Sequence, residues 1–352
     1  MTREPSWLLY GAYGYSGELI ARQAVERGLR PVLGGRREGP VKALAESLGL
    51  EWRAFAVDEV GALKAGLDGM NLVLNCAGPF SATAASMIDG CLQLGAHYLD
   101  ITGEIDVFAH AHAQHDRARS RGLLLCPGVG FDVVPTDCLA TLLKRELPEA
   151  QSLELAFDAG GGPSRGTALT AVEGLAAGGR IRQNGQLRRV PLAWQQREVA
   201  FQDGPRCVVS IPWGDVYTAH LSTGIADVVV YMAMPPKAIA RLRRLRPLRW
   251  LLGSAPAQWW LKRSVRQRVS GPDEARRSSS RSQVWGEVRS ADGRSVSGRL
   301  VTPNGYELTA ESAVRIAERV LRGGAREGGY CTPSQLMGAD FVRSLDGVQV
   351  LI

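Results

Sequence analysis

Short β-type runs alternate strictly with helical patterns from residue 7 to about residue 135, and this alternation restricts the fold more than any other feature of the sequence. The runs are apolar on both faces, as strands are when helices cover both sides of a sheet. The pattern predicts a parallel sheet of the α/β class. Its strands are expected at WLLYG, RPVLGG, EWRAFAV, NLVLNCAG, HYLDIT and LLLCPG.

The pattern changes after Pro148, where strands follow one another with little helix between them. This arrangement predicts an antiparallel sheet, with one helix at 164–179 and another from Thr309 to Leu321, for which TAES (309–312) is the expected start. Because 352 residues exceed what one hydrophobic core usually serves, we expect two domains. The strands of the second part are expected at LELAFDA, LRRVPLAW, REVAFQ, CVVSIPWG, DVVVYMAM, SQVWGEVRSADG and RSVSGRLVTPNG.

Gly11, Gly14 and Gly17 follow the first expected strand with the spacing G-x-x-G-x-x-G. In a strand–turn–helix unit, the first glycine permits a tight turn, the second lets the backbone approach a pyrophosphate, and the third lets the helix pack against the strand. The N-terminus of the helix then offers N–H groups and partial positive charge to the phosphates. The alternative is a tight turn that needs positive φ and binds nothing. The position of the motif in the first unit favours a dinucleotide site.

Arginine stands at the end of the second expected strand. An NAD-preferring site places Asp or Glu about twenty residues beyond the glycines, where the carboxylate binds the ribose hydroxyls. This chain has Gly34-Gly35-Arg36-Arg37 there, and a guanidinium can bind the 2′-phosphate of NADP. Two solvated surface arginines are the alternative, but the position favours NADP, in the form NADPH, as the cofactor.

Further motifs follow in a set order along nearly the whole chain: NCAGPF (75–80), HYLDITGE (97–104), PGVGFDVVPTD (127–137), GGPSRGTALT (161–170) and YCTPSQLMG (330–338). With these motifs the chain resembles saccharopine dehydrogenase-like oxidoreductases, and more narrowly the branch that contains trans-acting enoyl reductases. The resemblance implies a Rossmann-type NADP-binding domain with a parallel sheet over residues 1–147. It also implies an inserted mixed α+β domain for substrate and dimerisation over 148–327, and a segment, 328–352, that returns to the first domain.

The resemblance implies roles for particular residues as well. Arg36 would bind the 2′-phosphate, and the segment after the fourth strand would pass beneath the nicotinamide ribose. That segment ends an apolar strand at its carboxyl edge, where open α/β sheets bind ligands; a simple turn at Pro79 is the alternative. The pyrophosphate would be held by Gly11, Gly14, Tyr15, Ser16 and Gly17, and the ribose segment comprises Asn75, Cys76, Ala77, Gly78, Pro79 and Phe80.

The chain departs from the family at three positions. Tyr13 stands where the family commonly has Thr, and Arg165 interrupts a Gly-Gly pair. Cys126 stands where true saccharopine reductases carry an Asp that meets the amino acid substrate. Saccharopine is therefore not the expected substrate.

Hydride transfer is cofactor chemistry, so the protein must orient the acceptor and supply one proton. Tyr98 and Asp132 are the candidate proton donors, at or just after strand ends on the expected ligand side, with Asp100 and Glu104 nearby. Asp100 and Asp132 could instead cap turns or helices. Thr102 and residues 164–167 have the same two interpretations: substrate contacts or helix caps.

His110, His112 and His115 look like a metal cluster, but spacings of two and three residues do not form a chelating face. We expect them to be solvated helix residues, and we expect no metal site.

Ten cations and no acid lie in residues 237–268, and without them 32 basic residues stand against 35 acidic ones. Pro236 opens a helical pattern in which Ile239, Leu242 and Leu245 share one side. Tryptophans then follow between the cations, which suits an anionic membrane surface. A helix packed on the protein with snorkelling arginines is the alternative. Nucleic acid is not the expected partner, because no recognised nucleic-acid fold accompanies the segment.

The six cysteines include no C-x-x-C pair, and several lie in apolar runs, as reduced buried thiols do. MTREPSWLLY shows no secretory signal. We expect a cytoplasmic protein, peripheral at the inner face of a membrane if the basic segment binds lipid. The first functional hypothesis is an NADPH-dependent enoyl-type (C=C) reductase of a hydrophobic or lipid-linked substrate, with a homodimer as the candidate assembly. The second is an NADP-binding, lipid-associated sensor or scaffold without turnover.

Overall fold

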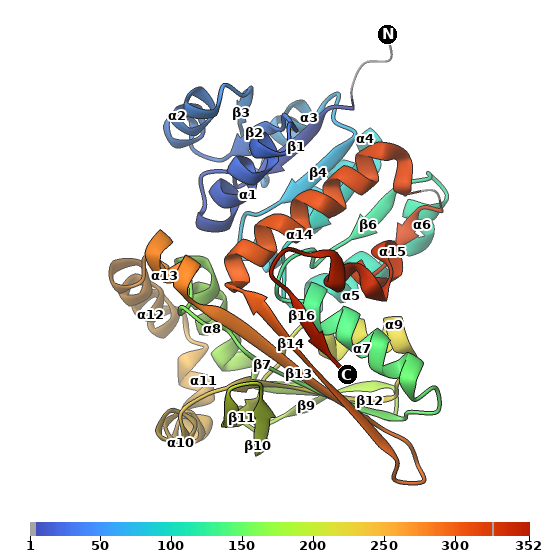
Figure 1. Ribbon diagram of the computed structural model, residues 1–352. Coiled ribbons are helices and arrows are strands. Elements are labelled where there is room, and N and C mark those ends of the chain that lie inside the picture. Colours follow the sequence, from blue (N-terminus) through green and yellow to red (C-terminus); the bar gives the residue numbers. More distant parts are fainter. Residues whose placement is uncertain (1–4, 326) are drawn as a thin grey trace. The chain divides into compact units, whose positions relative to one another are not determined.

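The computed structural model describes residues 5–325 and 327–352, and its contacts divide the chain into two compact units (Figure 1). Unit 1 comprises the chain up to Val134 together with Tyr306–Met337, and unit 2 comprises Pro135–Gly305 together with Gly338–Ile352. The predicted boundaries after residues 147 and 327 are wrong, because the chain crosses between the units after Val134, Gly305 and Met337. Of the segment expected to return to the first domain, 328–352, residues 338–352 lie in unit 2.

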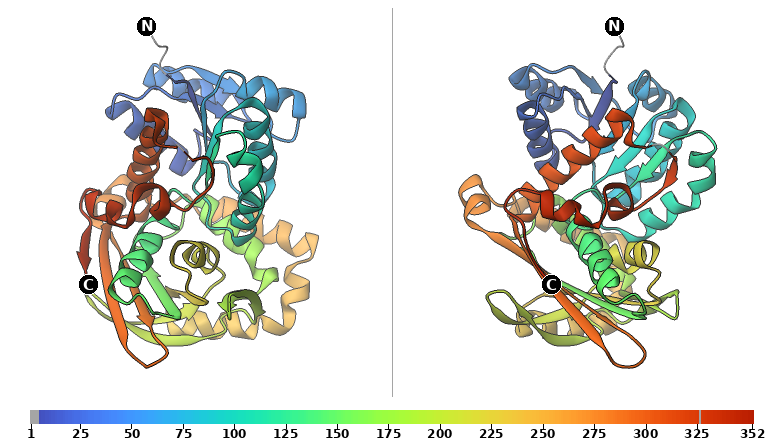
Figure 2. Two further views of the ribbon diagram at one scale, coloured as in Figure 1. Left: turned by 90° about the vertical axis from the view of Figure 1, so that its right-hand side faces the viewer. Right: turned by 45° about the vertical axis from the view of Figure 1, so that its right-hand side comes forward.

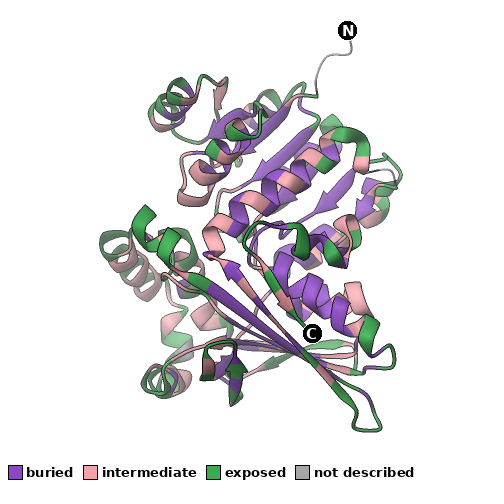
Figure 3. Cartoon of the chain, viewed as in Figure 1, coloured by how far each residue is buried: buried purple, intermediate pink, exposed green. Residues whose placement is uncertain are grey.

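Unit 1 is built on a seven-stranded sheet in the order β15-β6-β5-β4-β1-β2-β3, with every pair parallel. Strand β1 and its neighbour β4 are buried along their whole length, as the apolar runs predicted (Figure 3). The chain order reverses at the β1–β4 pair, which confirms a Rossmann-type sheet. The strands are β1 (Trp7–Tyr10), β2 (Val32–Gly35), β3 (Trp52–Ala54), β4 (Leu72–Asn75), β5 (His97–Asp100), β6 (Leu124–Cys126) and β15 (Gly329–Tyr330).

Helices cover both faces of this sheet (Figure 2). On one face, α1 lies beside α14, where Arg27 pairs with Glu318 at 3.1 Å. On the other face, α3, α4 and α5 pack in a row. The helices of unit 1 are α1 (Tyr15–Glu26), α2 (Glu38–Leu48), α3 (Val60–Leu67), α4 (Phe80–Leu94), α5 (Ile105–Ala113), α6 (His115–Arg119), α14 (Gly305–Arg319) and α15 (Pro333–Met337).

Helix α14 differs from its prediction in one respect. TAES was expected to start the helix, but α14 begins at Gly305, so Thr309 lies in its second turn. Thr309 does not cap the helix because its hydroxyl accepts a hydrogen bond from the Phe131 amide (2.9 Å) in another part of unit 1.

Unit 2 holds a nine-stranded sheet in the order β10-β11-β12-β7-β13-β14-β16, with the β8–β9 hairpin joined to β12. The sheet is mixed: β7 and β12 are parallel, whereas the other pairs are antiparallel, as the sequence predicted for the whole sheet. The strands are β7 (Ser152–Asp158), β8 (Gly179–Gln183), β9 (Gln186–Val190), β10 (Gln196–Phe201), β11 (Gly204–Ser210), β12 (Asp227–Ala233), β13 (Arg281–Arg289), β14 (Ser295–Pro303) and β16 (Gln349–Leu351).

Helix α7 packs on the central hairpin β13–β14, because Gly286 and Gly298 leave room there for Leu139 and Leu143. Helices α11 and α12 pack on α8. Among the described residues, no helix is both long and apolar enough to cross a bilayer. The helices of unit 2 are α7 (Val134–Glu146, whose first residue is counted in unit 1), α8 (Arg165–Ala177), α9 (Asp215–Thr223), α10 (Pro236–Arg244), α11 (Arg249–Leu252), α12 (Ala255–Arg268) and α13 (Glu274–Ser279).

Candidate functional site

The glycine-rich turn after β1 is packed so closely that side chains cannot fit at two of its positions. Gly11 has φ +80°, and a Cβ there would lie 2.7 Å from the backbone nitrogen of Ala77. A Cβ on Gly17 would lie 2.3 Å from the Gly11 carbonyl oxygen. The first contact brings the β1 turn against the loop that follows β4, and the second brings helix α1 onto the turn. These are the two packing roles expected for Gly11 and Gly17.

Helix α1 begins directly after this turn. The Gly14 amide donates to the Gly11 carbonyl (2.9 Å), and the first bond of the helix runs from Glu18 to the Gly14 carbonyl (2.9 Å). The amides of Tyr15, Ser16 and Gly17 precede that bond, so the hydrogen-bond ladder of the helix does not use them. Gly14, as the N-cap residue, contributes no capping side chain. Such a helix end is suited to bind a phosphate.

The two arginines after β2 differ in their surroundings. The Arg37 guanidinium lies 5.1 Å from the centre of the Tyr13 ring, and the Arg37 amide donates to the Tyr13 hydroxyl (3.4 Å). Tyr13 in turn packs on Gly35, where a Cβ would lie 2.5 Å from its ring. Arg36 is exposed and makes no hydrogen bond or ion pair with any residue that the structure describes. Arg36 is therefore available to an anionic ligand, whereas Arg37 is held by Tyr13.

Asn75 shapes the loop that follows β4. Its side chain is fully buried; its Oδ1 accepts the Ala77 amide (3.0 Å), and its Nδ2 donates to Thr83 Oγ1 (3.2 Å). Thr83 completes a closed ring of bonds by donating to the Ala77 carbonyl (2.7 Å). Cys76 follows Asn75, and burial raises the pKa of its thiol, so it stays uncharged. The loop from Asn75 to Phe80 is thus fixed against the glycine turn.

Tyr98 and Asp100 form a buried pair at the end of β5. The Tyr98 hydroxyl donates to Asp100 Oδ2 (2.8 Å) and receives a longer bond from Asn75 Nδ2 (3.4 Å). Asp100 Oδ1 accepts the amides of Thr102 (3.0 Å) and Gly128 (2.9 Å). Burial raises the pKa of Asp100 to about 6 and the pKa of Tyr98 well above its usual value. This geometry suits Tyr98 to hold Asn75 and Asp100 in place, whereas its predicted role as a proton donor stays a prediction.

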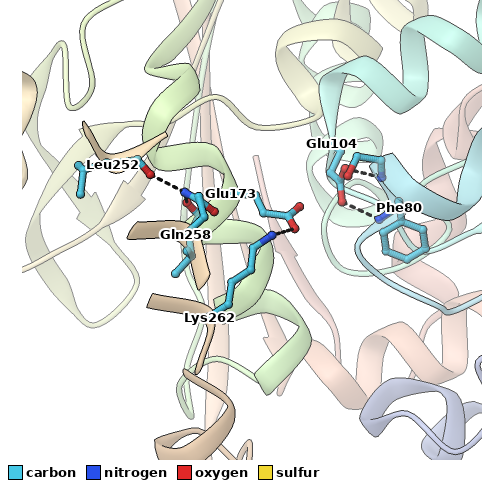
Figure 4. A network of polar contacts seen from close by, with 8 residues as sticks. Phe80, Glu104, Glu173, Leu252, Gln258 and Lys262 are labelled. Carbon is cyan, nitrogen blue, oxygen red and sulfur yellow. Dashed lines mark hydrogen bonds and ion pairs between the residues drawn. The ribbon is translucent and has the colours of Figure 1, made fainter. Parts of the chain in front are cut away.

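Glu104 binds the N-terminus of helix α4. Its two carboxylate oxygens accept the amides of Phe80 (2.9 Å) and Ser81 (2.8 Å), as Figure 4 shows. The positive end of the helix stabilises the charged carboxylate. Glu104 therefore anchors the loop from Asn75 to Phe80 at its far end.

Asp132 lies half-buried in the loop after β6, with its carboxyl group against Gly103, where a Cβ would lie 3.0 Å from Asp132 Oδ2. Burial, and then the negative charge of Glu104, raise the pKa of Asp132 to about 7. A carboxyl group with such a pKa can hold a proton at neutral pH and release it.

Helix α14 supports the loop that carries Asp132. Besides the bond from the Phe131 amide to Thr309, Ser312 Oγ donates to the Val129 carbonyl (2.8 Å). A Cβ on Gly130 would lie 2.9 Å from Thr309. Thr309 and Ser312 are not among the predicted site residues, and no local signal marks them.

The other candidates lie elsewhere or act structurally. Ser164 caps helix α8 by accepting the Thr167 amide (3.3 Å), and Arg165 donates to the Val269 carbonyl (3.0 Å), both in unit 2. The prediction of solvated histidines is wrong for His112 and His115: both are half-buried, because His112 packs on the Tyr330 ring and His115 Nδ1 accepts the Tyr330 amide (3.1 Å). The described residues contain no group of His, Cys, Asp and Glu that could hold a metal ion.

All the predicted cofactor residues lie at or after the carboxyl ends of β1, β2 and β4. Tyr98 lies on β5, and Asp132 follows β6. Because these strands are parallel neighbours, their ends share one edge of the sheet, and β1 and β4 meet where the order reverses. The arrangement can take an extended ligand with a phosphate at α1, a further anion at Arg36, and a reacting group toward Asp132.

Comparison with known proteins agrees with this arrangement. Residues 7–125 match the saccharopine dehydrogenase NADP binding domain. A trans-acting enoyl reductase of Mycobacterium leprae (strain TN) is 30% identical over 161 residues, which are 44% of this chain and 38% of the relative. A saccharopine dehydrogenase-like oxidoreductase of Arabidopsis thaliana is 28% identical over 152 residues, 37% of this chain and 32% of the relative. The chain thus matches less than half of the length of these relatives.

Two solved structures resemble the chain over nearly its whole length. Apo saccharopine dehydrogenase (L-Glu forming) from Saccharomyces cerevisiae has a TM-score of 0.65 at 12% identity, covering 99% of this chain and 100% of that one. Homospermidine synthase from Legionella pneumophila, in complex with NAD, has a TM-score of 0.67 at 9% identity, covering 99% and 91%. At these identities the likeness shows a shared fold.

Proposed function

We propose that the chain, whose residues 7–125 match the saccharopine dehydrogenase NADP binding domain, is an NADPH-dependent oxidoreductase that reduces a C=C bond in a hydrophobic or lipid-linked substrate. The match at residues 7–125 supports an NAD(P)-binding domain; the preference for NADPH, the enoyl-type reaction and the substrate class go beyond that match.

The single observation that carries the proposal is the turn from Gly11 to Gly17. Gly11 and Gly17 leave no room for side chains. The first amides of α1 follow β1, which meets β4 where the strand order of the sheet reverses. This combination fits a dinucleotide pyrophosphate. Arg36, exposed at the end of β2 without a partner among the described residues, supports the 2′-phosphate of NADPH as a second anchor.

The residues present fit the cofactor that the family implies. The amides of Tyr15, Ser16 and Gly17 would hold the pyrophosphate, and Arg36 the 2′-phosphate. The loop from Asn75 to Phe80 would support the nicotinamide ribose. When bound, the reduced nicotinamide supplies a hydride.

The chain must then manage the proton of the reaction. Reduction of a C=C bond adds one hydride and one proton, and the proton adds to the carbon next to the group that activates the bond. Asp132 supports this role because its raised pKa keeps a proton on the carboxyl oxygen near neutral pH. Glu104 has a different task, because its two oxygens are engaged by the amides of Phe80 and Ser81. It positions the loop and raises the pKa of Asp132.

The C=C reaction is favoured over other reductions by the names of relatives such as the Mycobacterium leprae protein. Cys126 supports a substrate other than saccharopine, because a thiol buried in β6 stands where the resemblance implies an Asp that meets the amino acid substrate.

The test is a pair of measurements on the purified chain. Calorimetry with each of the four oxidised and reduced nicotinamide cofactors should show binding, strongest with the phosphorylated pair. Consumption of NADPH is then followed with enoyl thioesters of increasing chain length, each beside its saturated counterpart. Oxidation that requires the double bond supports the proposal. Binding of NADPH without oxidation by any enoyl thioester would support the sensor or scaffold hypothesis instead, and no binding of any nicotinamide would refute both.

A further inference from the structure

The basic segment 237–268 contains two kinds of helix. Helix α10 buries its apolar side: Ile239 is fully buried and packs with Ala193 and Val209, and Leu242 is half-buried against the same cluster. The amphipathic pattern of α10 is therefore explained by packing on the protein, which was one of the two interpretations of the sequence. Any role for the segment beyond folding must come from its exposed cations and from α11 and α12.

Helix α12 packs on α8 through an inner row of side chains. Gln258 Nε2 donates to the carbonyls of Val172 (3.1 Å) and Leu252 (2.8 Å), and Lys262 Nζ pairs with Glu173 at 2.6 Å (Figure 4). These bonds fix which side of α12 faces the protein and which side faces outward.

Large aromatic side chains stand on the outward side. Trp259 and Trp260 are 61% and 64% exposed. They are exposed although Gln258 and Lys262, on the same helix, bind α8. The Arg263 guanidinium lies 5.6 Å from the centre of the Trp259 ring. On the adjoining α11, Trp250 is 77% exposed. We call the exposed Trp250, Leu251, Trp259, Trp260, Arg263 and Arg266 the tryptophan patch.

The cations of residues 237–268 also divide into a group that bonds to the protein and a group that is exposed. Arg243 donates to the Ala193 carbonyl (3.1 Å), Arg246 to the Leu192 carbonyl (2.7 Å), and Lys262 pairs with Glu173. Other cations are exposed and have neither a hydrogen bond nor an ion pair within 5–325 and 327–352. They are Lys237, Arg241, Arg244, Arg263, Arg266 and Arg268.

We propose that the tryptophan patch docks the protein on an anionic lipid bilayer, a property separate from the proposed reductase activity. Indole rings favour the headgroup region, and arginines bind the lipid phosphates. No acid interrupts residues 237–268 to weaken the attraction to a negative surface.

The alternatives fit these observations less well. A second copy that used the same patch across a twofold axis would bring like charges together. Nucleic acid would use the cations but not Leu248 and Leu251, which are 46% and 45% exposed. A bilayer uses both the charges and the apolar side chains.

The test is flotation of the full chain with phosphatidylcholine vesicles, with and without phosphatidylglycerol. We expect flotation only with the anionic vesicles, with a blue shift of tryptophan emission. W250A/W259A/W260A and R241A/R244A/R263A/R266A should each lower the vesicle partition coefficient by at least about tenfold. Both variants keep Arg243, Arg246 and Lys262, so the fold of the segment is retained, which thermal melting checks.

The matched control is K64A/R119A/R188A/R189A, which removes four exposed cations outside the segment and should float as the unaltered chain does. Failure of the unaltered chain to float on anionic vesicles would overturn the proposal, as would undiminished flotation of either patch variant. Loss of a dimer in light scattering without vesicle binding would assign the patch to a second copy. Salt-sensitive binding to a labelled DNA duplex without vesicle binding would assign it to nucleic acid. Either result overturns the lipid proposal and leaves the reductase proposal intact.

Discussion

The Arg37 guanidinium lies over the ring of Tyr13, 5.1 Å from the ring centre, whereas the neighbouring Arg36 has no hydrogen bond or ion pair with the described residues. Adjacent arginines with the same charge are therefore not equivalent. The Tyr13 ring leaves no room for a side chain at Gly35, whereas a Cβ on Gly34 would lie 3.0 Å from the side chains of Leu8 and Tyr10.

Arg36→Asp should reverse cofactor preference. The substitution removes the proposed 2′-phosphate ligand and places a carboxylate where NAD-preferring sites have one. Because a hydrogen bond to a charged group contributes about 1.5–3 kcal/mol, NADPH affinity should fall at least about tenfold while NADH affinity holds or rises. Calorimetry with both cofactors measures the change. Arg37→Gln is the matched control and should change the preference little; retained preference for NADPH in Arg36→Asp refutes the assignment.

Gly11→Ala should destabilise unit 1 and abolish cofactor binding. The new Cβ would lie 2.7 Å from the Ala77 nitrogen and 2.8 Å from the Cys76 carbonyl carbon, both backbone atoms, at a φ that L side chains rarely adopt. We expect a loss of more than about 2 kcal/mol in the free energy of unfolding, measured in urea. Gly28→Ala is the control, because φ is +77° there but nothing lies within 4 Å; it should cost about 1 kcal/mol. Equal losses would show that strain alone, not the contact with the β4 loop, matters at Gly11.

The parallel sheet and its ligand edge could be predicted because their signals are local. The buried strand β1, the glycine turn and the loop from Asn75 to Phe80 are each contiguous, and the ends of parallel strands must share an edge. The carboxylate bonds of Glu104 could not be predicted, because they depend on how α4 begins relative to β5.

Other features depend on contacts between distant residues. Thr309 meets Phe131 178 positions away, so nothing near it in sequence marks it as part of unit 1. One local signal could have located the hairpin: Asn184-Gly185, with φ of 50° and 75°, is a two-residue turn between β8 and β9. The strand predicted at LRRVPLAW covers most of β9, whereas most of β8 lies between that strand and the helix predicted at 164–179.

The proposed reduction should slow as pH rises through about 7. Asp132 donates a proton only in its neutral form, and its pKa is raised to about 7. The logarithm of kcat should fall with unit slope above that pH, and Asp132→Asn should be slow and lack this pH dependence. Asp100→Asn is the comparison variant for Asp132→Asn, because the Asp100 carboxyl group is fully buried and accepts the Gly128 amide in the loop after β6. A pH profile of Asp132→Asn that matches the unaltered chain would exclude Asp132 as the donor.

The raised pKa of Asp132 also predicts how the free energy of unfolding changes with pH. The folded pKa of Asp132 lies above the unfolded value of about 4, so the folded state binds more protons between pH 4 and 7. This group therefore favours folding at low pH and loses that effect as pH rises toward 7. Asp132→Asn should gain stability relative to the unaltered chain over this window, measured by urea unfolding at pH 5 and pH 8. A difference that does not change with pH would show that the pKa of Asp132 is not raised.

Thr309→Val should weaken the loop that carries Asp132. The valine keeps the shape of threonine but cannot accept the hydrogen bond from the Phe131 amide, which is buried. An unsatisfied buried amide costs about 1–3 kcal/mol, so the free energy of unfolding should fall by that order. Thr309→Ser keeps the hydroxyl and should recover most of the loss. If Asp132 depends on this support, Thr309→Val should also lower kcat more than it raises KM, because the cofactor turn at Gly11 is untouched. A valine variant as stable as the unaltered chain, beside a less stable serine variant, would show that the methyl packing against Gly130, and not the hydrogen bond, holds the loop.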